Sequence, residues 1–197
     1  MESIKNKKTS DYIAEQIANE ILAGRIAGNV PLRQEELAET LGASRIPIRE
    51  ALQILELQGL TVRLATRHIV TVDFSDRKIK ELYRMIADIE KNVLESIYEE
   101  GGAAQLKKAI EADTEIEEEE FHQLICRHAN NEYLQNLLQN AITYYIHFAI
   151  GCSGYRLDKL EQMKNQLVAD KGNRQEMWQP YYDELADCVV TERKKNQ

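Results

Sequence analysis

Two arginines, Arg45 and Arg49, lie four residues apart in the segment SRIPIREAL, which spans residues 44–52. A spacing of four places two side chains on the same face of a helix. Cations are slightly disfavoured at the start of a helix, because the helix dipole is positive there. Guanidinium groups bind phosphates and the O6 and N7 edge of guanine. The pair therefore indicates a surface that meets a negatively charged partner, although a solvated helix face fits the spacing alone.

A second group of residues could bind a metal. Glu118 and His122 are four residues apart, on one helical face, and carboxylate and imidazole are common metal ligands. His147, within the apolar segment AITYYIHFAI, is either a third ligand or a hydrogen-bonded interior histidine. No histidine follows His147 in the sequence. Because two protein ligands rarely hold a transition metal, we expect no tightly bound metal and no other cofactor, with Glu118 and His122 as weak candidates.

The residues around the arginine pair predict the elements that position it. Apolar residues at helical spacing favour helices over about 9–23, 33–41 and 45–58, the last of which Ser44 can cap. Pro47 falls in the first turn of that helix, where no helical hydrogen bond is lost. Residues 60–72 form two β-branched runs around a turn, which predicts a hairpin. This order is that of a winged helix-turn-helix, whose second motif helix enters the major groove of DNA by its N-terminal residues.

The charge of the chain is distributed unevenly. Residues 1–72 contain nine Lys/Arg and nine Asp/Glu, so the formal net charge of −8 over 197 residues comes from residues 73–197, with 16 Lys/Arg and 24 Asp/Glu. A nucleic-acid surface is therefore expected in the first third. No apolar run approaches the roughly 20 residues that span a bilayer. Three cysteines without a CxxC pair (Cys126, Cys152 and Cys188) fit reduced thiols in a cytoplasmic protein with no membrane partner.

Beyond residue 75, strand patterns disappear. Residues 76–100 read as one long amphipathic helix that Gly101 and Gly102 end. Further helices are expected over about 103–112, 115–129, 131–150, 156–170 and 175–193. The predicted fold is therefore mostly α, with a winged helix-turn-helix domain over 1–74 and an all-α helical bundle over 75–197.

The segment RQEELAETLGASRIPIREALQILELQGL resembles the DNA-binding domain of GntR-type bacterial transcription regulators, over about residues 10–72. The segments ELYRMIADIEKNVLE and FHQLICRHANNEYLQNLL resemble the FCD-type C-terminal domain of the FadR-like branch, over about 76–140. The resemblance implies a homodimeric repressor that binds a two-fold double-stranded DNA operator. It also implies control by a small-molecule effector in the C-terminal domain, and no enzymatic activity.

The resemblance also assigns individual residues. The predicted DNA contacts are Arg33, Ser44, Arg45, Ile46 and Arg49, with Arg67 and His68 in the wing. The glycine usual at the wing tip is replaced by Ala65, Thr66 or Arg67. In the FCD pattern D-x-x-F-H, Glu118 takes the position of a metal-binding Asp and His122 is kept, whereas two later histidines are missing. Ile86 stands where the family has an arginine that holds the effector's carboxylate. The predicted effector pocket is therefore more apolar, at Ile86, Glu118, His122 and His147.

Two alternative functions remain open. One is a small metal-assisted hydrolase that uses Glu118 and His122, although no nucleophile–base pair or phosphate-binding loop is visible. The other is a DNA-binding dimer without ligand control, in which the C-terminal domain only dimerises. The apolar stretch 141–150 and the aromatic residues Trp178, Tyr181 and Tyr182 fit a bundle core, a pocket wall or a dimer interface equally well.

Overall fold

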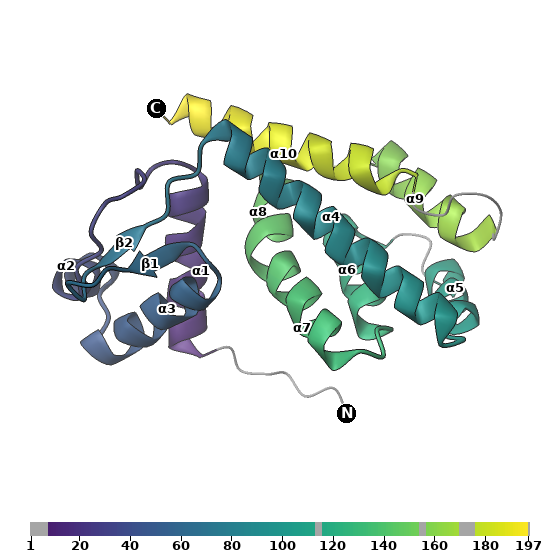
Figure 1. Ribbon diagram of the computed structural model, residues 1–197, viewed down its shortest axis with the longest axis horizontal. Coiled ribbons are helices and arrows are strands. Elements are labelled where there is room, and N and C mark those ends of the chain that lie inside the picture. The colour runs from purple at the N-terminus through teal and green to yellow at the C-terminus, as the bar shows by residue number, and fades with distance from the viewer. Residues whose placement is uncertain (1–7, 113–115, 154–156, 170–175, 197) are drawn as a thin grey trace. The chain divides into compact units, whose positions relative to one another are not determined.

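The computed structural model describes residues 8–112, 116–153, 157–169 and 176–196 (Figure 1). Backbone contacts divide these residues into two compact units. Unit 1 contains residues 8–75 together with 192–196, and unit 2 contains the described residues of 76–191. Across the described ranges, no helix combines the length and the apolar character needed to cross a membrane.

Unit 1 has three helices and a hairpin: α1 (Thr9–Leu22), α2 (Gln34–Leu41), α3 (Arg45–Leu57), β1 (Thr61–Arg63) and β2 (Ile69–Thr71). Apolar side chains at spacings of three and four give α1 and α3 one buried face each, and the two helices pack along each other. The strands are antiparallel, with Val62 opposite Val70. The sequence-based prediction of a winged helix-turn-helix is thus confirmed.

The connection between α2 and α3 is a tight turn. Gly42 ends α2 with φ at +60°, a left-handed conformation that glycine adopts without steric cost. Ser44 then occupies the N-cap position of α3 as expected, but its side chain makes no capping hydrogen bond. This turn sets the direction of α3 relative to α2.

The last turn of α10 (Trp178–Lys195) belongs to unit 1. Arg193 is buried there, and its Nη1 donates hydrogen bonds to the carbonyl oxygens of Ile21, at 2.7 Å, and Leu22, at 2.9 Å. Carbonyls at the end of a helix lack helical partners, and a cation suits the negative end of the dipole. The sequence placed all of 75–197 in the second domain, so this completion of unit 1 by the end of the chain was not predicted.

Unit 2 consists of helices: α4 (Asp76–Glu99), α5 (Ala103–Ala112), α6 (Glu118–Arg127), α7 (Glu132–Ala141), α8 (His147–Ser153), α9 (Leu157–Ala169) and most of α10. The buried face of α4 packs on α6 and α7. Helix α10 runs beside α4 (Figure 1), and ion pairs from Lys80 to Asp187 and from Arg84 to Asp183 join the two helices. The predicted all-α character of the C-terminal region is confirmed.

The segment expected to form one helix over 131–150 is interrupted. A π-helical turn spans Ile142–Ile146, between α7 and α8. One additional residue in a turn rotates the following helix by about 100° relative to the preceding one. The Tyr83 hydroxyl donates a hydrogen bond to the carbonyl of Tyr145, within this turn, at 2.8 Å. The rotation decides which side chains of α8 face the bundle, and it leaves His147 exposed rather than interior.

Candidate nucleic-acid interface and a buried polar cluster

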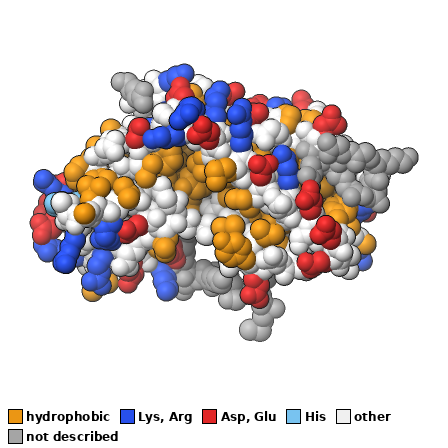
Figure 2. All heavy atoms as spheres, in the orientation of Figure 1, with side chains coloured by type: hydrophobic (Ala, Val, Ile, Leu, Met, Phe, Trp, Pro, Cys, Tyr) orange, Lys and Arg blue, Asp and Glu red, His pale blue; other side chains and the backbone are white. Residues whose placement is uncertain are grey.

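A groove of about 580 Å³ lies in unit 1 between the start of α2, the start of α3 and the wing formed by β1 and β2. Lys and Arg side chains gather at this end of unit 1, with acidic side chains among them (Figure 2). The charged and titratable residues that line the groove are Arg33, Glu35, Arg45, Arg63, Arg67 and His68. Three elements separated in sequence therefore present their cations to one concave surface.

The first turns of α3 present three of the predicted contact residues to solvent. Arg45 and Arg49 are exposed, and Ile46 is 62% exposed. Ile48 and Leu52, on the opposite side, are fully buried and fix the helix against α1. Arginine at such a position can bind guanine, and an exposed apolar side chain can contact the methyl group of thymine. The helix therefore has the groups that a recognition helix needs at the end that enters the groove.

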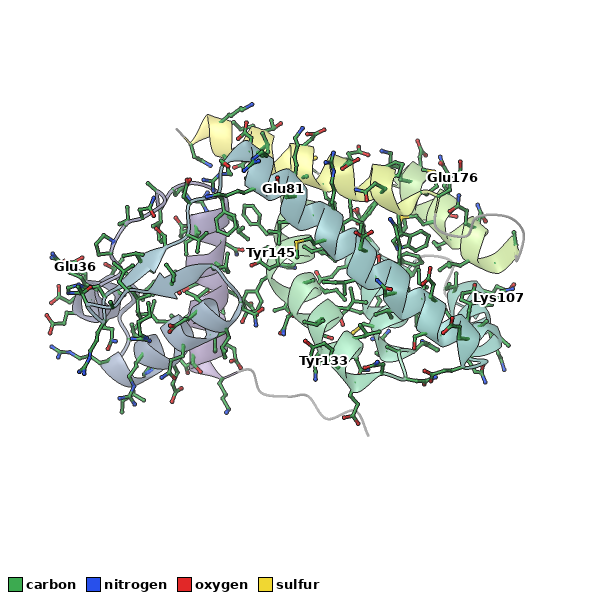
Figure 3. The ribbon with its side chains drawn as sticks, viewed as in Figure 1. Glu36, Glu81, Lys107, Tyr133, Tyr145 and Glu176 are labelled. Carbon is green, nitrogen blue, oxygen red and sulfur yellow. The ribbon has the colours of Figure 1, made fainter. Side chains whose placement is uncertain are left out.

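Three arginines of this surface are paired with carboxylates of the same unit. Arg45 Nη2 lies 3.1 Å from Glu35 Oε1, and Arg33 Nη1 lies 2.8 Å from Glu36 Oε1. Glu36, in the first turn of α2, is labelled in Figure 3. Arg63 makes two contacts with Glu56, from Nε at 3.3 Å and from Nη2 at 2.8 Å.

These acidic partners were not singled out from the sequence, where Glu35 and Glu36 look like ordinary acids in the first turn of a helix. Exposed ion pairs contribute about 0–1 kcal/mol. A DNA phosphate can therefore displace Glu36 from Arg33 at low cost.

The wing tip contains an arginine in a backbone conformation that favours glycine. Arg67 has φ at +67°, and its N–H donates to the carbonyl of Leu64 at 2.8 Å. The turn is closed by a hydrogen bond from Leu64 N–H to the carbonyl of His68, also at 2.8 Å. Among the three candidates for the replaced glycine, Arg67 is thus the one at the left-handed position. A left-handed residue other than glycine costs about 1–2 kcal/mol. Arg67 therefore places a cation at the wing tip at a cost in backbone strain.

Unit 2 contains a buried polar cluster centred on Glu90. Its carboxylate accepts three hydrogen bonds, from His122 Nδ1 at 2.7 Å, from Trp178 Nε1 at 2.7 Å and from the Tyr182 hydroxyl at 3.0 Å. All four side chains are fully buried. Burial and the nearby charge of Glu90 hold the pKa of Tyr182 well above its ordinary value, so this hydroxyl stays protonated and donates.

The cluster extends from His122 to Glu118 through Tyr181. The Tyr181 hydroxyl donates to Glu118 Oε1 at 2.8 Å and lies 2.8 Å from His122 Nε2. A hydroxyl has a single hydrogen, so Tyr181 can donate in only one of these two contacts. His122 thus lies between two buried carboxyl groups, one reached directly at Glu90 and one through Tyr181 at Glu118. Such an arrangement needs every partner, because an unpaired buried charge is costly.

The structure separates the four residues of the predicted effector pocket. Ile86, Glu118 and His122 are buried in unit 2, and Tyr181 joins the latter two. His147 does not join them: it is exposed, and its Nδ1 lies 2.7 Å from Glu119 Oε2. Glu90 was missed, although an acid one turn after Ile86 on the apolar face of α4 is a signal that sequence reasoning can use.

The cluster does not have the form of a metal site. Within the parts of the chain that the structure describes, no three His, Cys, Asp or Glu side chains are grouped so that they could hold a metal ion. Both ring nitrogens of His122 are hydrogen-bonded within the cluster, to Glu90 and to Tyr181. The donor set of this cluster therefore does not fit a metal, and the absence of a tightly bound metal stays a prediction.

A winged helix-turn-helix whose recognition helix and wing share a cationic groove defines the class of this protein, a sequence-specific DNA-binding protein. Residues 9–69 match the family of bacterial regulatory proteins called the gntR family. Unit 1 is thus similar to the DNA-binding domain of gntR-type regulators, and most of the chain is similar to transcription regulators.

Several relatives agree with this assignment. The chain is 26% identical over 166 residues to the HTH-type transcriptional regulator YdhC of Bacillus subtilis (strain 168), covering 75% of this chain and 74% of YdhC. It is 24% identical over 151 residues to the gluconate operon transcriptional repressor of the same organism, covering 70% of this chain and 62% of the repressor.

A solved structure shares the fold. The structure of Lar, described as controlling the expression of the Listeria monocytogenes agr system, superposes with a TM-score of 0.58 at 18% identity. The match covers 95% of this chain and 99% of Lar.

Proposed function

We propose that this regulator is a cytoplasmic repressor that binds a two-fold DNA operator, with α3 in the major groove and the wing on the adjacent backbone. The observation that carries the proposal is the convergence of Arg33, Arg45, Arg67 and His68 on one groove. Arg45, Ile46 and Arg49 read base edges, whereas Arg33, Ser44 and the wing residues position the duplex through its phosphates. A relative named as a repressor supports the sign of regulation.

The proposed assembly is a homodimer held by unit 2. The apolar stretch 141–150, expected to be available for this purpose, is mostly buried within its own unit. The large apolar side chains that unit 2 exposes, within the described ranges, lie on α4 and α7: Met85 is 63% exposed, Tyr133 72% and Leu137 37%. Tyr133 and Leu137 are one turn apart, and Tyr133 projects from α7 (Figure 3). We propose that a second copy of the chain covers this face.

Control by a small-molecule effector in unit 2 is also part of the proposal, together with membership of the FadR-like branch and an FCD-type domain. Buried ionisable side chains such as Glu90 and His122 are weak evidence for stability alone, because burying a charge is costly. Glu90 and His122 have a function in ligand response when a bound effector rearranges their hydrogen bonds. The alternative is a dimer without ligand control, in which the cluster is only structural. A metabolite that raises the melting temperature and lowers operator affinity supports ligand control.

No observation favours the hydrolase alternative. Glu118 and His122 are both buried and hydrogen-bonded within the cluster, and His147 lies on the surface with Glu119. These residues are therefore not arranged around a common reacting atom.

The test of DNA binding begins with selection of duplexes from a random-sequence library by the full-length protein. Replacement of Arg49 by alanine is expected to reduce affinity for the selected duplex by about 5- to 150-fold, because a good base contact discriminates by about 1–3 kcal/mol. The matched control is Arg77→Ala, which removes an exposed arginine from α4. A selected duplex that both variants bind as well as the wild type does, with equal sequence preference, contradicts the assignment.

A further inference from the structure

An acidic side chain lies inside the cationic groove. Glu35 belongs to the first turn of α2 and lines the groove together with Arg45. Its Oε1 is 3.1 Å from Arg45 Nη2, and both side chains are 70% exposed. An ion pair this exposed adds little to stability. A carboxylate also repels phosphates that come within the Debye length, about 8 Å at physiological salt. Glu35 therefore weakens DNA binding by its charge and does little to stabilise the fold.

The contact with Glu35 does not exhaust the hydrogen-bonding capacity of Arg45. A guanidinium group has five N–H donors in a planar fork, and the contact with Glu35 engages Nη2. The remaining donors suffice for O6 and N7 of a guanine. Glu35 can therefore keep its place while Arg45 reads a base, and it then holds the fork in one orientation.

The same contact opposes another use of Arg45. On DNA without the matching guanine, the guanidinium would turn to a phosphate, which is the source of sequence-independent affinity. Turning to a phosphate gives up the pair with Glu35 and brings the phosphate towards a carboxylate. Glu35 therefore weakens binding to non-operator DNA more than binding to the operator.

We propose that Glu35 is a specificity-determining residue, which restrains Arg45 so that it binds a base edge rather than the DNA backbone. This inference rests on the proposed function, because it needs a specific operator. Arg45 makes the contact with DNA, and Glu35 acts through Arg45 as a positioning residue. Its removal changes the ratio of specific to non-specific affinity, a quantity that a purely structural side chain does not alter.

The experiment compares the selected duplex with a scrambled duplex of the same length and composition. Fluorescence anisotropy measures the affinity of the full-length wild type, Glu35→Gln and Glu39→Gln for both duplexes over a series of salt concentrations. Glu39 is an exposed acid on the same helix and is not among the residues that line the groove. Its substitution changes the net charge equally and is the matched control. Melting temperatures of all three proteins show whether α2 is intact.

Glu35→Gln is expected to bind the scrambled duplex about three- to fourfold more tightly at about 50 mM salt than the wild type does. The slope of log affinity against log salt becomes steeper by about 0.9, as for one additional phosphate contact. Operator affinity stays equal or falls, so the preference for the operator drops at least about threefold. An unchanged preference, or an equal drop in Glu39→Gln, overturns the inference. A wild type that selects no duplex at all overturns the proposed function instead.

Discussion

Replacement of Glu90 by glutamine tests whether the buried cluster of unit 2 holds a charge. Glutamine keeps the size of the side chain, so it creates no cavity. It removes the negative charge, however, and replaces one oxygen by an NH₂ group. Trp178 and Tyr182 both donate to the same oxygen, Oε2, and His122 Nδ1 donates to Oε1. An amide nitrogen in place of Oε2 faces two donors, and one in place of Oε1 is accommodated only by a His122 without a hydrogen on Nδ1.

The expected loss of stability is large for an isosteric change. Three charge-assisted hydrogen bonds of about 1.5–3 kcal/mol each become neutral bonds or are lost. His122 also loses its direct carboxylate partner, and removing one partner from a buried pair typically costs about 3–5 kcal/mol. We take about 3–5 kcal/mol for the whole substitution, out of the about 5–15 kcal/mol typical of a folded domain. At roughly 2–4 °C per kcal/mol, the melting temperature falls by about 6–20 °C.

The assay is thermal and urea unfolding of Glu90→Gln beside Glu95→Gln, which changes an exposed acid of the same helix. A double-mutant cycle with Tyr182→Phe measures the coupling, because Tyr182 donates directly to Glu90. The phenylalanine substitution is expected to cost less in the Glu90→Gln background than alone. Equal melting temperatures for Glu90→Gln and Glu95→Gln, or strictly additive free energies in the cycle, would refute the reasoning.

Three further predictions concern other parts of the molecule. Arg67→Gly relieves the left-handed strain and is expected to raise stability by up to about 1 kcal/mol, after the entropy of glycine in the unfolded chain is counted, while operator affinity falls; a variant that binds the operator as the wild type does contradicts the wing contact. Leu137→Glu is expected to shift the protein from dimer to monomer in sedimentation at micromolar concentration, and an unaffected dimer removes the proposed α4–α7 interface. Burial raises the pKa of Cys126 to about 11 and that of Tyr145 to about 12, so the folded chain holds both protons more tightly than the unfolded chain. Their contribution to stability is therefore complete below pH about 9 and is lost as the pH rises further; a melting temperature that stays constant up to pH about 11 contradicts this.

The parts that sequence could predict are those that depend on neighbouring residues. The helix that contains Arg45 and Arg49, its exposed cationic face and its start after Ser44 all follow from spacings within one or two turns. The long helix α4 follows from the same periodicity. The winged fold follows because each of its short elements is predicted from adjacent residues, and their order along the chain is that of a winged helix-turn-helix.

The parts that sequence could not predict depend on contacts between distant residues or on a backbone detail. Trp178 and Glu90 are 88 residues apart, and no periodicity links them. The turn of the wing could place Ala65, Thr66 or Arg67 at its left-handed position, and only the hydrogen bonds of the turn decide among them. The π-helical turn at Ile142–Ile146 lies in a stretch that is apolar nearly all round. An extra residue in a turn does not change the sequence of apolar and polar residues there, so hydrophobic periodicity does not reveal it.

Arg193 affects the order in which the protein can fold during its synthesis. The DNA-binding unit is encoded first, yet the carbonyls of Ile21 and Leu22 obtain their guanidinium partner from a residue more than 170 positions later in the chain. A nascent chain that has completed the wing still lacks this contact, and domains generally fold as units from the N-terminus onward. The last turn of α10 must therefore dock on a unit that is already largely formed, and a product that ends before residue 193 lacks that final contact. Unit 1 is therefore complete only after residue 193 has been made.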